Sequence, residues 1–390
     1  MTPAARVQTA IEILDQVFDG APAEKALTGW ARRSRFAGSK DRAAVRDHVY
    51  DALRRRASAA RMGGGLTGRA VMAGLLVQDG AELEALFTGA AYAPSRLSEA
   101  ELAALAAAAP ADAVEDIPEW MRPAFDRTLG ADLPRVAEAM RQRAPVFLRV
   151  NLRKGTRAAA QAQLKGEGVQ TEAHDLSDTA LEVVEGARRV AGSAAYRNGL
   201  VELQDVSSQA AVQALPLTEG QRVLDFCAGG GGKVLAMAGR CAARYYAHDA
   251  HAQRMRDLPE RARRAGVDIK VASLKDLEKG YPFDLVFCDV PCSGSGTWRR
   301  TPDAKWRFDA SDLADLQRIQ SDILRQAAGL VAPGGTLAYA TCSLFAEENG
   351  AQIESFLSEF SGWHLTFQNQ WTMQAGSDGF FLACLTRRAN

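Results

Sequence analysis

The feature that most constrains the fold of this chain is a repeated alternation of apolar strand and helix after residue 200. The strand segments are RVLDFCA, YYAHD, FDLVFCDV and GGTLAYATCS, and each ends in polar residues or glycine. Such alternation builds a parallel sheet that is covered by helices on both faces. It predicts an α/β, Rossmann-like doubly wound domain over residues 206–390, with ligands beyond the carboxyl ends of the strands.

Two smaller regions precede that domain, because 390 residues exceed what one hydrophobic core usually holds. Residues 1–125 carry apolar side chains at helical spacing, for example Ile13, Leu14 and Val17, and predict an all-α bundle. Prolines 110, 118, 123 and 134 place a boundary between residues 112 and 140. The alternating segments VFLRVNL and ALEVVEG, on either side of a short helical pattern, predict a small α+β module over residues 140–205.

Composition excludes several classes of protein. The charged, amphipathic N-terminal segment is no signal peptide, and no apolar run of about 18 residues is present to cross a membrane. The six cysteines are scattered, without a CxxC pair or a nearby histidine cluster, so free thiols and no metal site are expected. We expect a cytoplasmic protein.

Positive charge is locally concentrated although the formal net charge is zero. The first concentration surrounds the segment FAGSKDR and comprises Arg32, Arg33, Arg35, Lys40, Arg42 and Arg46, followed by Arg54, Arg55 and Arg56. Taken alone it is compatible with a solvated helical face or with a nucleic-acid contact. The second concentration follows the segment DVPCSGSG and comprises Arg299, Arg300 and Lys305, flanked by Trp298 and Trp306. These side chains could stack on bases and bind phosphates, or the tryptophans could belong to the core.

A glycine-rich turn in VLDFCAGGGGKVLAMAG predicts a nucleoside cofactor. Asp225 ends a strand, four glycines follow, and a helix begins near Lys233. The spacing does not fit a phosphate-binding loop, although a dinucleotide remains possible. Asp249, at the end of the next strand, could accept both hydroxyls of a ribose or merely cap a helix.

Two thiols are predicted to meet at the same edge of the sheet. One strand delivers Asp289 and Cys292, and the following strand delivers Cys342 between Thr341 and Ser343. Both cysteines follow strands and adjoin polar residues, unlike Cys227, Cys241, Cys288 and Cys384, which we expect to be ordinary small hydrophobic residues.

Taken together, DFCAGGGGK, DVPCSGSG, RRTPDAKW and YATCSLFAEEN resemble the bacterial Sun/RsmB-type RNA 5-methylcytosine methyltransferases, from about residue 145 to DGFFLACL. The N-terminal segment SKDRAAVRDHVYDALRRR resembles a NusB-like RNA-binding domain, and the small module is expected to be RRM-like. The resemblance implies Cys342 as covalent nucleophile, Asp289 near cytosine N3, Cys292 in product release and Lys233 lining the site. It implies S-adenosylmethionine contacts from Asp225, Cys227, Ala228, Gly229, Gly230, Gly231, Gly232, Lys233, Asp249, Ser273 and Asp289. It further implies RNA contacts from Arg299, Arg300, Lys305 and Trp306.

Two positions depart from the family pattern. The cofactor loop has glycine where the family usually has proline, and Ser273 stands near a family aspartate that contacts adenine, with Asp276 as a possible substitute. The implied activity is 5-methylcytosine formation, with 16S ribosomal RNA as favoured substrate and a monomeric enzyme. Transfer RNA, a DNA-type use of Cys292 as nucleophile, and an RNA-binding or ribosome-assembly protein with a vestigial enzyme domain remain alternatives.

Overall fold

The computed structural model describes residues 1–280 and 282–388, which form two compact units. Residues 1–143 and 298–308 make up the first unit. Residues 144–297 and the described part of 309–390 make up the second. The short segment 298–308 therefore belongs with the N-terminal helices, although its neighbours in sequence belong to the second unit. Sequence analysis did not anticipate this arrangement.

The first unit is helical, as predicted for residues 1–125. Its longer helices are α1 (Pro3–Phe18), α2 (Ala23–Arg33), α3 (Ser39–Arg54), α4 (Arg56–Gly63), α5 (Gly68–Gln78), α7 (Glu99–Ala107), α8 (Arg122–Leu129) and α9 (Leu133–Arg141), with the shorter α6 (Leu83–Leu86) and α16 (Pro302–Arg307). The Thr2 side chain caps α1, and Pro3 occupies its first turn. Apolar faces of α1, α3 and α5 pack around Leu14, Val49 and Val71.

The second unit begins with a small antiparallel sheet. Its elements are β1 (Phe147–Val150), α10 (Arg157–Gly166), β2 (Gln170–Ala173), β3 (Ala180–Glu185), α11 (Ala194–Arg197) and β4 (Val201–Leu203). The strand order is β2-β3-β1-β4, and each pair is antiparallel. This β-α-β-β-α-β sequence with its central β1 and β3 is the ferredoxin-like arrangement that RRM modules share.

A larger sheet completes the second unit and confirms the predicted Rossmann-like fold. Its elements are α12 (Val206–Gln213), β5 (Arg222–Asp225), α13 (Gly232–Arg240), β6 (Arg244–Ala247), α14 (Leu258–Ala265), β7 (Ile269–Val271), α15 (Leu274–Glu278), β8 (Phe283–Asp289), α17 (Ala310–Ala328), β9 (Val331–Thr341), α18 (Gly350–Glu359), β10 (Trp363–Thr372) and β11 (Gly379–Arg387). The order β10-β11-β9-β8-β5-β6-β7 is parallel from β9 to β7, and β11 runs antiparallel to both of its neighbours.

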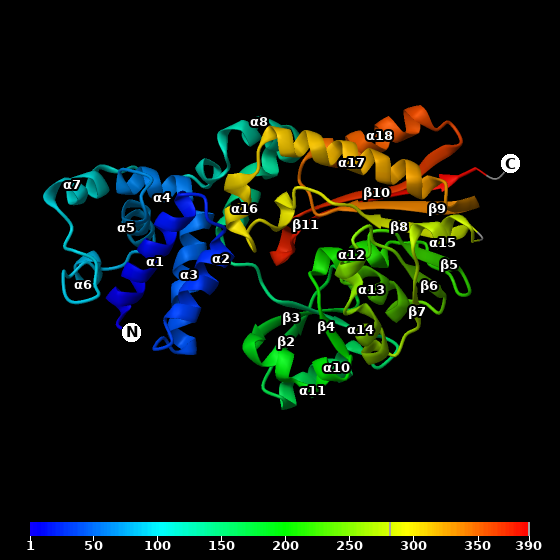
Figure 1. Ribbon diagram of the computed structural model, residues 1–390, viewed down its shortest axis with the longest axis horizontal. Helices are drawn as coiled ribbons and strands as arrows, with labels where there is room; N and C mark the ends of the chain where they lie inside the picture. Colours follow the sequence, from blue (N-terminus) through cyan, green and yellow to red (C-terminus); the bar gives the residue numbers. More distant parts are fainter. Residues whose placement is uncertain (281, 389–390) are drawn as a thin grey trace. The chain divides into compact units, whose positions relative to one another are not determined.

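The sheet separates two apolar layers. Val223 and Leu285 face the layer of α12, α13 and α14, whereas the next residues, Leu224 and Val286, face the layer of α17 and α18. Figure 1 shows these two sets of helices on opposite faces of the sheet. Burial on both faces explains why the strand sequences are continuous apolar runs rather than alternating patterns.

Candidate active site

The candidate site lies where the strand order reverses, between β5 and β8. Ligands of open α/β sheets bind at this point, beyond the carboxyl ends of the strands. Asp225 ends β5, Asp289 ends β8, Asp249 follows β6 and Cys342 follows β9. The parallel register brings these residues, which are far apart in sequence, to one edge of the sheet.

The glycine loop has a backbone that other residues would strain. Gly229 and Gly231 have φ angles of 51° and 82°, in the left-handed region. A side chain at Gly231 would also place its Cβ 2.3 Å from Leu258 Cδ1. The loop then enters α13 at Gly232, so backbone N–H groups and the helix N-terminus face the edge of the sheet.

We expect Gly231→Ala to weaken S-adenosylmethionine binding by at least about tenfold and to lower the free energy of unfolding by about 2–4 kcal/mol, because a left-handed backbone and overpacking each add strain. Titration calorimetry and urea unfolding would measure the two effects. Gly220→Ala is the matched control, because Gly220 has φ 79° but a Cβ there would meet only open space. Equal cofactor affinity in the two variants would contradict a steric role for Gly231.

Side chains from the small sheet, from the residue that follows it and from α14 hold this loop by hydrogen bonds. The Arg149 guanidinium on β1 is buried and donates to the Gly232 carbonyl at 2.8 Å, and Gln204 donates to the same carbonyl at 3.3 Å. Arg261 of α14 donates to the Gly230 carbonyl and pairs with Glu202 at 3.0 Å. The sequence motifs do not predict these supports, because Arg149, Gln204 and Arg261 all lie outside them.

Asp225 offers an acceptor to a ligand. Its Oδ2 accepts the Val234 amide at 3.0 Å, whereas Oδ1 is buried without a hydrogen-bond partner among the described residues. An unsatisfied buried acceptor costs about 1–3 kcal/mol, so a ligand that donates a hydrogen bond here would be stabilised. Burial, followed by the nearby Asp289 charge, raises the pKa of Asp225 to about 8, against the opposing effect of Lys233.

The raised pKa of Asp225 gives a pH prediction. With this pKa, the cofactor-free folded protein would keep the proton up to about pH 8, whereas an unfolded aspartate loses it at about pH 3.9. The free energy of unfolding should therefore fall as pH rises from about 4 to about 8, and be flatter in Asp225→Asn. Urea unfolding from pH 5 to 9 in the absence of cofactor would measure both curves. Parallel curves would refute the assignment.

Asp249 holds the neighbouring loop. Its Oδ2 accepts the Gly229 amide at 2.9 Å and its Oδ1 accepts the His251 amide at 2.8 Å. Arg254 lies 3.8 Å from Oδ2. Each carboxylate oxygen has a second lone pair, so the predicted acceptance of ribose hydroxyls is compatible with these bonds.

Ser273 and Asp276 form the capping box of α15. The Ser273 hydroxyl donates to Asp276 Oδ2 at 2.6 Å and accepts the Asp276 amide at 3.3 Å. A local structural role therefore accounts for both residues. Adenine contact by either one stays a prediction.

The two predicted thiols meet. Cys292 Sγ and Cys342 Sγ lie 3.4 Å apart, although 50 residues separate them in sequence. The thiol contact with Cys342, followed by burial, raises the pKa of Cys292 well above its ordinary value. The other cysteines near the sheet, Cys227 and Cys288, lie in the apolar layers, and burial raises their pKa values as well.

Beside the thiols is an ion pair between Lys233 Nζ and Asp289 Oδ2, at 2.5 Å. Burial disfavours the charged ammonium, yet the adjacent Asp289 raises the pKa of Lys233 above its ordinary value. Lys233 also lies over the Phe380 ring, 5.5 Å from its centroid. All four predicted catalytic side chains therefore lie close to the carboxyl edge of the sheet. Asp289 ends β8 and Cys292 follows it, Cys342 follows β9, and Lys233 is at the start of α13.

A buried glutamate that sequence analysis missed holds both cysteine loops. Glu348 accepts the Ser293 amide at 2.9 Å, the Ser293 hydroxyl at 2.5 Å and the Ser343 hydroxyl at 2.5 Å. Gln320 of α17 donates to it at 2.9 Å. Since Ser293 follows Cys292 and Ser343 follows Cys342, one carboxylate fixes the chain next to both thiols. The segment FAEEN could have indicated Glu348 as a site residue, because its acidic residues follow closely after the strand that precedes Cys342.

We expect Glu348→Gln to lower kcat by about tenfold to a hundredfold with little change in S-adenosylmethionine affinity, because a small displacement of a reacting group is costly. Loss of the charged acceptor should also lower the free energy of unfolding by about 2 kcal/mol or more. Single-turnover kinetics and urea unfolding would test this. Glu354→Gln, on the exposed face of α18, is the control. A normal kcat in Glu348→Gln would contradict a positioning role.

The predicted RNA contacts of RRTPDAKW lie in the first unit, and two of them are in its interior. Lys305 and Arg299 are 2% and 3% exposed. Lys305 Nζ donates to the Arg54 carbonyl at 3.3 Å, and Trp306 Nε1 donates to the Leu53 carbonyl at 2.7 Å. Both bonds satisfy carbonyls in the last turn of α3, which have no partner within the helix. Phosphate binding by buried Arg299 and Lys305 is therefore not supported by the structure, whereas Arg300 is exposed.

Among residues 1–280 and 282–388, no group of three or more histidine, cysteine, aspartate and glutamate side chains could hold a metal ion. In the same part of the chain, no helix combines the length and apolar character needed to span a membrane.

The fold and the site define the class of S-adenosylmethionine-dependent methyltransferases. The solved structure of PH0851 matches with a TM-score of 0.73 over 99% of both chains, at 22% identity. A methyltransferase homolog protein from Pyrococcus horikoshii matches with a TM-score of 0.60 over 69% of this chain and 94% of that chain, at 24% identity. At these identities the likeness shows the fold alone.

Sequence comparison identifies the family. The model of the 16S rRNA methyltransferase RsmB/F family matches residues 212–386, and the RsmF/B-like ferredoxin-like domain matches residues 117–190. Ribosomal RNA small subunit methyltransferase B of Klebsiella pneumoniae subsp. pneumoniae is 33% identical over 293 residues. The chain belongs to the RsmB/F family, which confirms the predicted resemblance. The alignment covers 70% of this chain and 66% of that relative's length, just under two thirds. The NusB-like assignment of the N-terminal helices stays a prediction.

Proposed function

We propose that this protein methylates carbon 5 of a cytosine in RNA, with Cys342 as the covalent nucleophile. The observation that carries the proposal is the 3.4 Å contact between Cys292 and Cys342 beside the Lys233–Asp289 ion pair. Simple methyl transfer to an oxygen or nitrogen needs no thiol. Carbon 5 of cytosine does, because the ring is a poor nucleophile until a thiolate adds to carbon 6.

The cofactor is S-adenosylmethionine, and the chain's residues fit it. The unpartnered Oδ1 of Asp225, the left-handed glycines and Asp249 form a cradle for a nucleoside. Bound there, the cofactor supplies a methyl group on a positively charged sulfur. The Gly229–Gly232 loop and Asp249 would hold it at the end of β5, on the same edge of the sheet as the thiols.

The family resemblance assigns the nucleophile to Cys342. Cys292 Sγ lies 3.4 Å from Cys342 Sγ, so its S–H group can donate a hydrogen bond to that sulfur when it is a thiolate. Cys342 then forms a bond to carbon 6, and the ring π electrons move to carbon 5. The proton that the Cys342 thiol loses passes through the Asp289 carboxylate to N3, where it neutralises the developing charge.

The reaction ends by β-elimination. After carbon 5 has taken the methyl group, it must lose its proton, and the electron pair of that C–H bond re-forms the ring double bond while the Cys342 thiolate leaves. We assign Cys292 to this release: its thiol gives a proton to the departing Cys342 sulfur, 3.4 Å away, and the resulting Cys292 thiolate accepts the proton from carbon 5. The N3 proton is lost to solvent. Lys233 holds the Asp289 carboxylate in place throughout.

We infer ribosomal RNA of the small subunit as the substrate, which the names of the relatives support. A base inside a duplex cannot be attacked above its plane, so the cytosine must be unpaired or flipped out. The ferredoxin-like module and the N-terminal helices would help to hold such RNA. The proposal includes a cytoplasmic, monomeric enzyme.

The test is methyl transfer from radiolabelled S-adenosylmethionine to unmodified 16S ribosomal RNA and to transfer RNA, followed by nucleoside mass spectrometry. We expect label in 5-methylcytosine of the ribosomal RNA. Label only in transfer RNA would show that the substrate is transfer RNA, and would leave the proposed 5-methylcytosine chemistry unchanged. Cofactor binding without any labelled RNA would favour a vestigial enzyme.

A further inference from the structure

Many arginines of the first unit pair with carboxylates: Arg6, Arg46, Arg54, Arg55, Arg61, Arg69, Arg135, Arg141, Arg143 and Arg307. By contrast, five exposed cations between the end of α2 and the first turn of α3 have no side-chain hydrogen bond or ion pair to any described residue: Arg32, Arg33, Arg35, Lys40 and Arg42. In a chain of zero net charge, this is a local positive surface without internal compensation.

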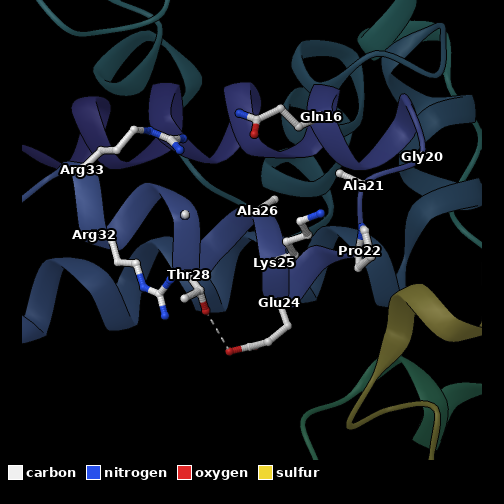
Figure 2. Close-up of a pocket in the computed structure, with 11 residues that line it drawn as sticks. Gln16, Gly20, Ala21, Pro22, Glu24, Lys25, Ala26, Thr28, Arg32 and Arg33 are labelled. Carbon is white, nitrogen blue, oxygen red and sulfur yellow. Dashed lines mark hydrogen bonds between the residues drawn. The ribbon is translucent and has the colours of Figure 1, made fainter.

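Four of these cations, Arg32, Arg33, Arg35 and Arg42, line grooves. Arg32, Arg35 and Arg42 line a groove of about 550 Å³ together with Leu27 and Ala31. Arg32 also borders a neighbouring groove of about 910 Å³, which Figure 2 shows, and there Arg32 and Arg33 extend from opposite sides of α2. A concave surface lined with guanidinium groups fits an extended polyanion.

Two exposed aromatic rings share a groove of the first unit, and one of them, Phe36, follows Arg35 directly in the sequence. Phe36 is 78% exposed and Tyr92 is 86% exposed, and both line a third groove of about 670 Å³ with Trp30. Tyr92 has a φ angle of 64°, which is rare for a bulky residue and marks a strained turn. Two large rings exposed to solvent, on the unit that also carries the unpaired guanidinium groups, can serve as a stacking platform for unpaired bases.

We infer that this basic–aromatic surface, made of Arg32, Arg33, Arg35, Phe36, Lys40, Arg42 and Tyr92, binds a single-stranded segment of the substrate RNA. The inference rests on the proposed RNA substrate and adds where the RNA is held. The cations would contact phosphates, and the two rings would stack on bases. An acidic protein segment would use the cations but has less need of two exposed rings, so RNA is the partner that both features fit.

The test uses the full chain and three sets of substitutions. The first reverses charge in the groove: Arg32→Glu, Arg35→Glu and Arg42→Glu. The second removes the rings: Phe36→Ala and Tyr92→Ala. The control makes the same charge change on exposed positions of the Rossmann-like domain: Arg256→Glu, Arg263→Glu and Arg318→Glu. A fluorescein-labelled 12-nucleotide RNA strand, the same strand as a duplex, and 16S ribosomal RNA are the probes.

We expect the charge-reversed variant to bind the single strand at least about tenfold more weakly than the control, with a slope of log Kd against log salt that is smaller by about 2, because each phosphate contact on a single strand contributes about 0.7. The ring variant should lose at least about tenfold with an unchanged slope, since stacking is not ionic. For 16S RNA, KM should rise while kcat and S-adenosylmethionine affinity stay constant.

Single-strand binding equal to the control in both variants would overturn the inference, and the surface would then be a candidate for a protein partner. Equal losses on the single strand and the duplex would overturn the stacking role. Failure of the proposed function would look different. If the wild-type protein methylates no RNA while oligonucleotide binding still depends on these residues, the RNA-binding surface is supported and the proposed methylation is refuted.

Discussion

Cys342→Ala should abolish methyl transfer, with a fall in rate of about 10⁴-fold or more, because the substitution removes the thiolate that we propose adds to carbon 6 and so activates carbon 5. The variant should still bind S-adenosylmethionine, since the predicted cofactor contacts lie at the ends of β5 and β6. It should form no covalent complex with RNA. Transfer of radiolabel, titration calorimetry and gel electrophoresis under denaturing conditions would measure the three properties.

Cys241→Ala is the matched control for this substitution. Cys241 follows α13 and lies away from the thiol pair. Cys241→Ala therefore makes the same chemical change as Cys342→Ala, at a position outside the site. It should keep full activity. If Cys342→Ala still transfers methyl groups, or if it and not the wild type is trapped on RNA, the assignment of the nucleophile is wrong.

Cys292→Ala should accumulate a denaturant-resistant complex between protein and RNA, with turnover lowered by at least about a hundredfold, as expected when a group that assists one proton-transfer step is removed. The methyl group should already be on the base of the trapped RNA, because addition and methyl transfer depend on Cys342. Rapid quenching within one turnover, followed by nucleoside analysis of the trapped complex, would show this.

The double substitution Cys292→Ala with Cys342→Ala sharpens the test. If the complex forms through Cys342, it disappears in the double variant. Persistence of the complex there would locate the bond elsewhere, and rapid turnover by Cys292→Ala alone would remove Cys292 from the release step. Loss of all activity in Cys292→Ala without a trapped complex would instead support Cys292 as the nucleophile, as in DNA-type enzymes.

Local sequence patterns determined much of this protein. The strand-to-glycine turn at Asp225 and the cysteines at the ends of two strands predicted the Rossmann-like fold and the meeting of Cys292 with Cys342. This was possible because parallel strands place their carboxyl ends at one edge, whatever their separation in sequence. The four consecutive glycines predicted a loop whose backbone can approach a ligand closely. Two of them, Gly229 and Gly231, have left-handed φ angles, which glycine adopts readily.

Tertiary structure alone decided which polar residues face a ligand and which face the protein. Lys305 and Trp306 read as RNA contacts from their charge and aromatic character, yet they bond the last carbonyls of α3, some 250 residues earlier in the chain. Ser273 and Asp276 cap a helix, and Glu348 joins two loops. Patterns along the sequence report periodicity and turn geometry, which are local. The partner of a polar side chain is set by long-range packing, and that packing determined the roles of these residues.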